Sequence, residues 1–382
     1  MAARKKWRYV EEDAVSAWYG LGADEYMTEA QSEAAEEAWL RFYTYRNHCA
    51  LVGRFQHLQA ELNLAYCERA DVQYSRRLTG GGAIIMGAEQ LGICLATHTQ
   101  RFDFQRLREL YVLFSKPVVG ALRALEIPAN FRSRNDLEVH GRKVAGLGIY
   151  VSPTGCVQFH CSLLLDLDVP LMLRVLNIPR EKYDDKRLIR SVEQRITTLR
   201  REGKPNLQMH DLRTLLREQF EKDFDVDLFD SAFGESEQQQ IGKFAQQRYQ
   251  SEDWIFQHSP QPDMNGMGLK KTKAGLLRVY IALKGETIKS VLITGDFFQG
   301  LEVFKEVESL LKWSPLEREL IEEVVHSAFA KWEEAQREKL PLEPSELCDA
   351  LWIAARRARA EHRFTYDGSC YYPEKETRGE NP

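Results

Sequence analysis

The chain has 382 residues, of which 43% are hydrophobic and 10% aromatic, so it can bury a substantial core, and its length favours two domains. Its net charge is −5 and its pI is about 6.1, which argues against a nucleic-acid binder because such proteins present a strongly basic face. No segment reaches the roughly 18 consecutive apolar residues that span a bilayer, and no apolar stretch follows the basic residues at the start. We therefore expect a cytoplasmic protein that does not bind membranes.

The cysteines are scattered, with no CxxC pair and no Cys/His cluster. They stand at Cys49, Cys67, Cys94, Cys156, Cys161, Cys348 and Cys370. An odd number of scattered cysteines is typical of reduced thiols and not of a disulfide framework or a zinc site.

Hydrophobic spacing in the first part of the chain predicts helices beside strands. We expect helices over 14–40, 58–70 and 104–125, and strands over 43–53, 72–77 and 91–97. Two hairpin arms follow over 137–139 and 144–151, then a strand over 157–167 and helical segments as far as Phe229. Because the strands come in antiparallel pairs beside helices, the predicted fold class is α+β and not doubly wound.

The composition changes after residue 231, where polar residues and then Pro, Gly and Asn accumulate. We expect a linker over 246–265 between a first domain over 1–245 and a second over 266–382. Strands over 276–283 and 287–294 predict a hairpin, and helices over 300–311, 315–339 and 345–361 complete a smaller α+β unit. The polar tail from Tyr366 is expected to fray.

A run of glycines, Gly80-Gly81-Gly82, follows Arg76 and Arg77 and leads into an apolar strand. Glycines let the backbone approach a ligand and turn its N–H groups toward an anion, and an arginine fork suits a phosphate or carboxylate. Neither common phosphate loop is present, since GxxxxGK[ST] is absent and the third glycine of GxGxxG would fall on Ile85. A tight strand connection explains the glycines equally well.

Asp136 and Lys143 are seven residues apart across the predicted hairpin, so they can face each other. A structural salt bridge is one interpretation. The other is an active site in which Lys143 neutralises a phosphate or carboxylate while Asp136 holds a metal ion.

His160 stands beside Cys161 on the next predicted strand, which suggests a thiol nucleophile with its base. Neighbours on a strand point to opposite faces, however, so the two are poorly placed to act as a couple. Cys161 is better explained as a small buried residue. The basic stretch from Arg187 to Thr197 indicates nothing specific by itself.

Taken together and in this order, these segments resemble the two-domain lipoate–protein ligase A family, whose blocks read VGRxQN, RRxSGGGA, ND, GRKVSG, HGTLL, SVRSRVTN and GDFF. The matching segments are Leu51-Val52-Gly53-Arg54-Phe55-Gln56, Arg76-Arg77-Leu78-Thr79-Gly80-Gly81-Gly82-Ala83, Asn135-Asp136, Gly141-Arg142-Lys143-Val144-Ala145-Gly146, His160 to Leu164, Arg190 to Thr197 and Ile293-Thr294-Gly295-Asp296-Phe297-Phe298. The resemblance extends over most of residues 20–355.

The resemblance implies a fold of the class II synthetase and biotin-ligase type, with a mixed, mainly antiparallel sheet, flanking helices and a small accessory domain. It implies that ATP, with Mg²⁺, activates lipoate as lipoyl-AMP, which then acylates a lysine of a carrier protein. Carriers similar to the glycine-cleavage H protein, to E2 lipoyl domains or to the lipoate-binding proteins of sulfur oxidation are all open. We expect a monomer.

By position in these blocks, Lys143 is the catalytic candidate, because it would contact both the acyl carbonyl and the phosphate. The residues implied for binding lipoyl-adenylate and ATP are Arg76, Arg77, Thr79, Gly80, Gly81, Gly82, Ala83, Asn135, Asp136, Gly146, His160 and Ser162. Of these, Asp136 would also hold the magnesium. His160 would lie near the adenylate or the acyl tail, with a core histidine as the alternative.

The chain departs from the family where Met86-Gly87 replaces the usual His-Asp and Cys161 replaces a glycine, so contacts to the nucleotide can differ. The main rival is an acyltransferase that uses a cysteine thioester, but 129–136, where related transferases carry that cysteine, has none. A biotin–protein ligase is disfavoured because its GRGRxG-like loop is absent. A catalytically silent carrier-binding protein remains open.

Overall fold

The computed structural model describes residues 4–31, 37–104, 106–132, 135–177, 193–297, 301–336 and 339–362. The chain divides into two compact units: Met1–Ser259 with Gly295–Gln299, and Pro260–Thr294 with Gly300–Pro382. None of the helices in these ranges is long and apolar enough to cross a membrane.

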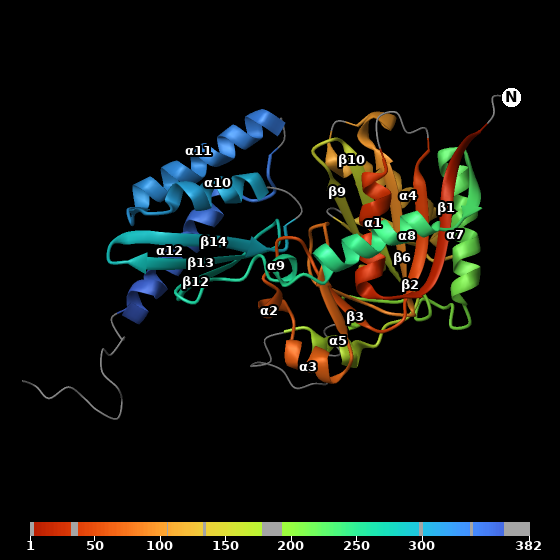
Figure 1. Cartoon of the computed structure of the whole chain (residues 1–382), viewed down its shortest axis with the longest axis horizontal. Helices are drawn as coiled ribbons and strands as arrows, with labels where there is room; N and C mark the ends of the chain where they lie inside the picture. Colours follow the sequence, from red (N-terminus) through yellow and green to blue (C-terminus); the bar gives the residue numbers. More distant parts are fainter. Residues whose placement is uncertain are drawn as a thin grey trace, which may run out of the picture. The chain divides into compact units, whose positions relative to one another are not determined.

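The described part of the first unit is built on an eight-stranded sheet, in the order β11-β1-β2-β6-β10-β9-β8-β7 (Figure 1). β1 pairs with β11 and β2 in parallel, and the other neighbours are antiparallel. The strands are β1 (Lys5–Val15), β2 (Trp39–Tyr45), β6 (Gln90–His98), β7 (Asn130–Arg132), β8 (Asp136–Val139), β9 (Arg142–Val151), β10 (Cys156–Leu164) and β11 (Val226–Ser231).

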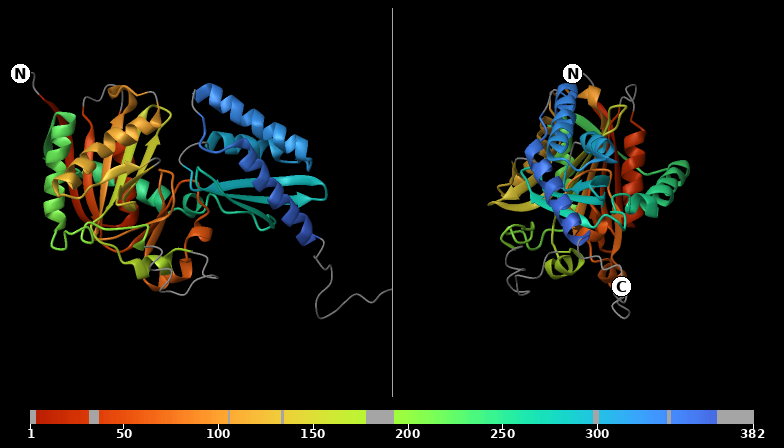
Figure 2. Two further views of the ribbon diagram at one scale, coloured as in Figure 1. Left: turned by 180° about the vertical axis from the view of Figure 1, so that it is seen from behind. Right: turned by 90° about the vertical axis from the view of Figure 1, so that its left-hand side faces the viewer.

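Helices pack on both faces of this sheet (Figure 2). They are α1 (Ala17–Glu29), α4 (Leu107–Ala124), α7 (Met209–Phe224) and α8 (Glu235–Phe244). Strand β2 illustrates the division, because Phe42 belongs to the core under α4 and α7 while its neighbour Tyr43 belongs to the core under α1 and α8. Alternation along the strand therefore gives the sheet two buried faces.

A second sheet, in the order β4-β3-β5, carries the glycine run between β4 and β5. Its strands are β3 (Cys49–Val52), β4 (Gln73–Arg76) and β5 (Ile84–Met86). Around the two sheets lie α2 (Leu58–Glu61), α3 (Leu64–Arg69), α5 (Val169–Val175), α9 (Glu252–Ile255), a 3₁₀ turn (Thr99–Arg101) and a π-helical turn (Ala245–Tyr249).

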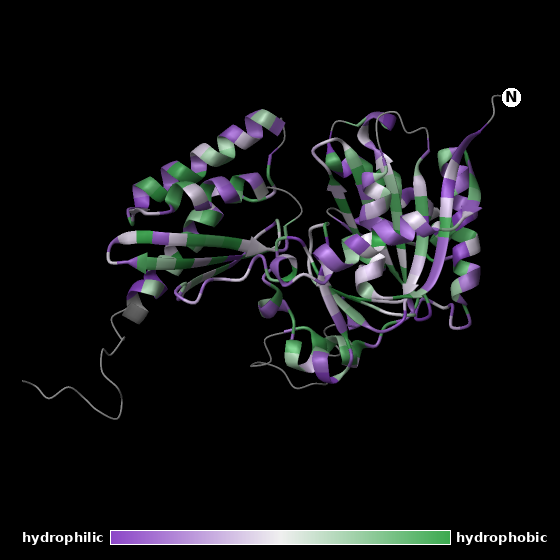
Figure 3. Ribbon diagram, in the orientation of Figure 1, coloured by the Kyte–Doolittle hydropathy of each residue, from purple (hydrophilic) through white to green (hydrophobic). Residues whose placement is uncertain are grey.

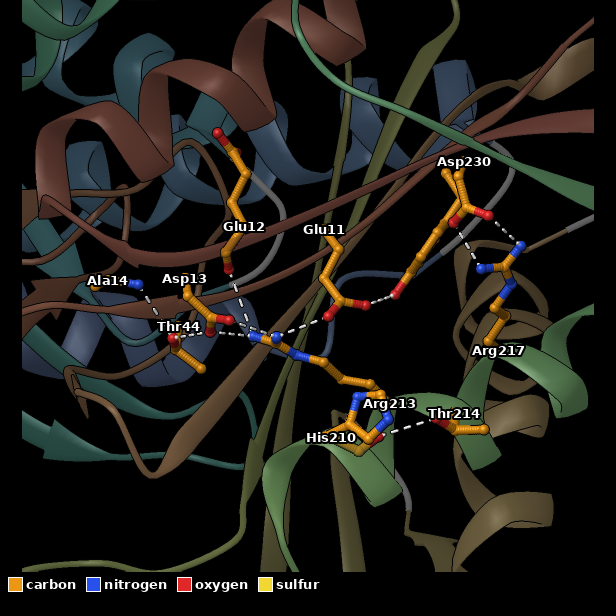
Figure 4. A network of polar contacts seen from close by, with 11 residues as sticks. Glu11, Glu12, Asp13, Ala14, Thr44, His210, Arg213, Thr214, Arg217 and Asp230 are labelled. Carbon is orange, nitrogen blue, oxygen red and sulfur yellow. Dashed lines mark hydrogen bonds and ion pairs between the residues drawn. The ribbon is translucent and has the colours of Figure 1, made fainter.

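One polar network ties α7 to the end of β1 (Figure 4). The buried guanidinium of Arg213 donates to the Glu11 carboxylate at 3.0 Å and to both oxygens of Asp13 at 2.6 and 2.9 Å. Glu12, between them, presents its backbone carbonyl to Arg213 and turns its side chain away. Beyond it the strand bulges, with Ala14 at a φ of 55°.

The second unit has a four-stranded sheet in the described residues, in the order β12-β13-β14-β15, with helices packed against it. Its elements are β12 (Gly266–Lys271), β13 (Leu276–Lys284), β14 (Thr287–Gly295), β15 (Ser314–Pro315), α10 (Leu301–Leu311), α11 (Arg318–Gln336) and α12 (Pro344–His362). Hydrophobic residues run along β14 in Figure 3. A Cβ on Gly268 would lie 2.0 Å from the Ala350 carbonyl oxygen, so glycine there lets α12 lie directly on β12.

The α+β class and the mainly antiparallel sheet are confirmed, and the predicted C-terminal hairpin is present as β13 and β14. Several boundaries were wrong. In the described part of the range 14–40, the predicted helix is α1 alone, because Ser16 caps its start by accepting from the Tyr19 N–H and β2 begins at Trp39. The helix predicted over 58–70 breaks at Asn63, which caps α3.

Two further strand boundaries differ from the prediction. The strand predicted over 43–53 is two strands, β2 and β3, which belong to different sheets. The helical run predicted to reach Phe229 ends at Asp225, whose left-handed backbone (φ 53°, ψ 51°) turns the chain into β11. Strand β1 was not predicted at all.

Replacing Glu308 by glutamine should remove a pH dependence of stability from the second unit. Glu308 accepts a hydrogen bond from the Ile293 N–H at 2.7 Å, and burial raises its pKa from the ordinary 4.5 to about 7. Since the folded state then binds more protons than the unfolded state between these two values, stability falls as pH rises through that window. Glutamine keeps the acceptor without the charge.

Urea denaturation at pH 5 and pH 8 checks this prediction. Glu308→Gln should be clearly more stable than wild type at pH 8 and close to it at pH 5, whereas Glu302→Gln, at an exposed position of the same helix, should be close to wild type at both. An equal effect of Glu308→Gln at the two pH values would contradict the explanation.

Candidate active site

The glycine loop between β4 and β5 is held close to the chain after β3. Gly81 has a φ of 94°, which only glycine adopts easily. A Cβ on Gly53 would lie 1.9 Å from the Gly81 carbonyl oxygen, so both positions need glycine for the loop to pass here. The Arg54 N–H donates to the Thr79 carbonyl at 3.0 Å and fixes the start of the loop.

Arg77 supports this loop from beneath. Its guanidinium is buried and donates to the carbonyls of Leu51 and Gly80, and to that of Gly82 at 2.9 Å. Burial lowers the pKa of Arg77 to about 10, because removing the guanidinium from water destabilises its charged form. An anion bound at the loop would offset that destabilisation.

Arg76 points the other way and does not line the pocket. Its side chain donates to five backbone carbonyls, those of Gly53, Arg54, Gln56, Trp254 and Ile255. Burial, together with the neighbouring charge of Arg77, lowers the pKa of Arg76 to about 9. Arg76 therefore holds the chain after β3 against the segment of Trp254 and Ile255, and of the two arginines predicted to bind the ligand only Arg77 lines the pocket.

Lys143 and Asp136 face each other across the β8–β9 hairpin, with Nζ 2.7 Å from Oδ1. The side chains are 31% and 32% exposed, so both can reach a ligand. The turn uses left-handed backbone at His140 and Gly141, with φ values of 50° and 76°. Backbone bonds at both ends fix Lys143, whose N–H donates to the Arg195 carbonyl at 2.7 Å and whose carbonyl accepts from Thr197 at 2.8 Å.

The absence of a side chain at Gly146 leaves room for the Lys143 ammonium group. A Cβ at that position would lie 3.1 Å from Lys143 Nζ and 3.2 Å from the Ser162 hydroxyl oxygen. The ammonium group therefore lies over a gap in the strand, next to Ser162 on β10. Gly148 has a similar role two residues further along β9, since a Cβ there would lie 2.9 Å from Thr79 of the glycine loop.

Successive side chains of strand β10 point to opposite faces of the sheet. His160 and Ser162 line the pocket, whereas Cys161 lies in the core under α4 and α7. Burial raises the pKa of the Cys161 thiol to about 12. Cys161 is therefore the buried residue predicted from the sequence and does not form a couple with His160.

Behind His160 lies a chain of buried charges. Its Nδ1 is 3.5 Å from the Tyr43 hydroxyl and 3.8 Å from Asp24 Oδ2. Asp24 also accepts from Tyr43 at 2.8 Å and from Arg41 at 2.9 Å, and Arg41 donates from its Nε to Glu12 at 2.7 Å. Burial alone would raise the pKa of Asp24, but the contact with His160 and the charge of Arg41 outweigh it, so the pKa is lowered.

The other ring nitrogen of His160 is the one available to a ligand. Among the residues that the structure describes, Nε2 has no hydrogen-bond partner, although it is buried and the side chain is only 5% exposed. Since buried polar groups are nearly always paired, a group in the pocket is the expected partner. Sequence reasoning found His160 but missed Asp24 and Arg41. The available signal was a charged Arg41 inside an otherwise apolar and aromatic strand.

These elements enclose a pocket of about 60 Å³. Most of the predicted site residues line it, together with Ile84, Leu147 and Gly148, which were not predicted. The predicted residues in the lining are Arg77, Thr79, Gly80, Gly81, Gly82, Ala83, Asn135, Lys143, Gly146, His160 and Ser162. Asp136 lies beside the pocket through its ion pair with Lys143.

Two further predictions concern the edge of the pocket. Asn135 is held by two bonds to Leu147, from its side chain to the carbonyl at 3.1 Å and from the Leu147 N–H to its own carbonyl at 2.8 Å. The block Arg190-Ser191-Val192 lies outside the described residues. The cationic side chains of Arg77 and Lys143 and the glycine loop therefore line one small pocket, an arrangement that favours a phosphate or carboxylate.

Residues 16–221 match the family model of the lipoyl protein ligase A/B catalytic domain. The chain belongs to this family. Among its relatives is lipoate-protein ligase LplJ of Bacillus subtilis, 27% identical over 297 residues that cover 78% of this chain and 87% of LplJ. Another is octanoyltransferase LipM of Halalkalibacterium halodurans, 23% identical over 65% of this chain and 98% of LipM. The chain is therefore similar to proteins named for two different reactions.

Solved structures of similar proteins show the same fold. A structure from the archaeal lipoylation system of Thermoplasma acidophilum, described as a bi-partite lipoate protein ligase and its E2 lipoyl domain, gives a TM-score of 0.60 at 21% identity, over 67% of this chain and 98% of the matched chain. A lipoate-protein ligase A bound with ATP gives 0.57 at 19%, over 66% and 98%. The family and fold class predicted from the sequence are confirmed.

Proposed function

We propose that this protein uses ATP to activate lipoate as lipoyl-AMP and then attaches the lipoyl group to a lysine of a carrier protein. The observation that carries the proposal is the position of the Lys143 ammonium group, next to Ser162 and opposite the glycine loop that Arg77 supports. A ligase of this kind must stabilise negative charge on a phosphate and then on an acyl oxygen at nearly the same place. The similarity to LplJ, which is named a lipoate-protein ligase, supports the same reaction.

In the first half-reaction a lipoate carboxylate oxygen attacks the α-phosphorus of ATP, and pyrophosphate leaves. Lys143 would stabilise the charge on the phosphoryl oxygens, and the loop N–H groups would orient them. In the second, the amine of the carrier lysine attacks the acyl carbonyl, and AMP leaves. Lys143 would then stabilise the charge on the carbonyl oxygen.

A magnesium ion fits this site only together with the nucleotide. The described residues hold no group of three or more His, Cys, Asp or Glu side chains suited to a metal ion. Asp136 would hold the ion as a single carboxylate and the phosphates would supply the remaining oxygens, which is the usual way that Mg²⁺ binds in such sites. Its charge would help neutralise the phosphates.

The similarity to LipM makes a cysteine-dependent octanoyltransferase the second candidate. That reaction requires a thiolate at the pocket. Cys161, on the strand β10 that pairs with the strand of Lys143, faces the core with its pKa raised to about 12, and residues 129–136 contain no cysteine. These observations favour the ligase.

We expect Cys161→Ser to keep at least half of the wild-type activity, because serine is close to cysteine in size and the thiol has no role in the proposed reaction. The measurement is pyrophosphate release from ATP with and without lipoate, followed by mass spectrometry of a carrier. Lipoate-dependent release that survives in Cys161→Ser supports the ligase. Octanoyl transfer between carriers without ATP, abolished in Cys161→Ser, would establish the thiol route instead.

We also propose that the second unit is the accessory domain of the family and that the carrier is a lipoyl domain or a related protein. The linker expected over 246–265 overlaps the first unit, which contains α9 and extends to Ser259. The structural neighbour from Thermoplasma acidophilum is described as a bi-partite lipoate protein ligase and its E2 lipoyl domain, which supports a carrier of this kind. Parallel reactions with an E2 lipoyl domain, an H protein and a lipoate-binding protein of sulfur oxidation would rank the three. Equal rates, or none, would count against a dedicated carrier.

A further inference from the structure

Gly295, the last residue of β14, and the two residues after it form hydrogen bonds with other parts of the first unit. The Gly295 N–H donates to the Phe55 carbonyl at 3.0 Å, the Asp296 carboxylate accepts from Gln56 Nε2 at 2.8 Å, and the Phe297 carbonyl accepts from the Gly81 N–H at 3.0 Å. Gly295–Gln299 belongs to the first unit although the chain before and after it belongs to the second. We name Gly295, Asp296 and Phe297 the latch segment.

Gln56 joins the latch segment to the glycine loop. It is 1% exposed, and while its Nε2 donates to Asp296 its Oε1 accepts from the Gly53 N–H at 2.9 Å. Gly53 is the residue against which the Gly81 carbonyl lies, at a distance that leaves no room for a Cβ. The loop is therefore held from both sides, by Gly53 through Gln56 and by Phe297 directly.

The hydrogen bond to the Phe297 carbonyl occupies the Gly81 N–H, a donor that a bound nucleotide phosphate would use. Backbone N–H groups of a glycine-rich loop are the donors that bind phosphate, and the Gly81 N–H is already given to a carbonyl. The pocket beneath the loop measures about 60 Å³, whereas sites for small molecules are on the order of 300–1,000 Å³. Both observations indicate that the glycine loop, in this structure, leaves too little room for a nucleotide and has one phosphate donor already occupied.

We propose that the latch segment is an autoinhibitory contact that closes the glycine loop, and that Gln56 and Asp296 are positioning residues that set how readily the loop opens for ATP. This inference rests on the proposed function, because it takes ATP as the ligand. Phosphate must displace the Phe297 carbonyl from the Gly81 N–H. Weakening the Gln56–Asp296 bond therefore favours the open loop and strengthens ATP binding.

Four full-length variants separate the hydrogen bond from the charge. Asp296→Ala removes the acceptor, and Gln56→Glu removes the donor while an oxygen still accepts from Gly53. Asp296→Asn keeps an acceptor without the charge. In the double variant Gln56→Glu with Asp296→Asn the bond can form again in the opposite direction, from the asparagine amide to the glutamate oxygen.

Titration calorimetry with a non-hydrolysable ATP analogue and Mg²⁺, without lipoate or carrier, measures the effect. Asp296→Ala and Gln56→Glu should bind the analogue about threefold to tenfold more tightly than wild type, on the order of one net hydrogen bond. Asp296→Asn and the double variant should bind as wild type does. In pyrophosphate exchange, the KM for ATP should fall in the first two variants with little change in kcat.

Three results would overturn the inference. Unchanged or weaker binding in Asp296→Ala and Gln56→Glu would mean that the latch does not oppose ATP. Tighter binding in Asp296→Asn would mean that the charge of Asp296 acts and not its bond. Absence of binding in every form, wild type included, would overturn the latch and the proposed ligase together, whereas the first two results leave the ligase standing.

Discussion

Lys143→Ala should lower lipoate-dependent pyrophosphate release by about a hundredfold to a thousandfold, the usual cost of losing one group that stabilises charge in a transition state. Lys143 lines the pocket, and its ammonium group lies beside Ser162 in the space that a side chain on Gly146 would fill. The substitution is tolerable for the fold, because the side chain is 31% exposed and its ion pair with Asp136 lies near the surface.

The matched control is Lys116→Ala. Lys116 also forms an ion pair, with Asp223 at 3.0 Å, but on the helices α4 and α7 that cover the other face of the sheet. That variant should release pyrophosphate at the wild-type rate. Equal activity in Lys143→Ala and wild type, with both folded by circular dichroism, would remove Lys143 from the chemistry and with it the main support for the ligase.

The features of the site that the sequence predicted are the local ones. The glycine loop, Asp136 and Lys143 lie in short segments whose geometry follows from a turn or a hairpin. Arg76 and Arg77 show the limit of this reasoning. As neighbours at the end of a strand they point to different sides, so only Arg77 reaches the pocket.

The features that were missed depend on contacts between distant segments. β1 and β11 pair in parallel across 221 positions, from Lys5 to Val226, and nothing local marks such a partner. The same holds for Asp24 on α1, which meets Arg41 on β2 and His160 on β10. The latch segment joins Gln56 to Asp296 over 240 positions. Hydrophobic periodicity predicts which face of a helix or strand is buried, but it does not predict which other element packs against that face.

The buried Asp24–Arg41 pair leads to the second large prediction, that Asp24→Ala destabilises the protein by about 3–5 kcal/mol, the usual cost of leaving one member of a buried ion pair uncompensated. Both side chains are fully buried, and Glu12 would be the charged partner that Arg41 keeps among the residues that the structure describes. The Tyr43 hydroxyl would lose its acceptor as well. Urea denaturation at pH 7 measures the change.

Asp230→Ala is the matched control, because Asp230 binds Arg217 at 2.6 Å but is 74% exposed. A pair of that kind contributes at most about 1 kcal/mol. If Asp24→Ala and Asp230→Ala have similar effects on the free energy of unfolding, the buried pair is not a main source of stability.

The double variant Asp24→Ala with Arg41→Leu separates stability from function at the pocket. Removing both charges should restore most of the free energy of unfolding, because a buried ion pair replaced by apolar side chains costs little. It does not restore the charged partner of His160 Nδ1, so the ring keeps only the 3.5 Å contact with the Tyr43 hydroxyl, which has itself lost its acceptor Asp24. We therefore expect a stable protein whose affinity for lipoyl-AMP is at least threefold weaker. Full affinity in the double variant would mean that Asp24 stabilises the fold without positioning His160.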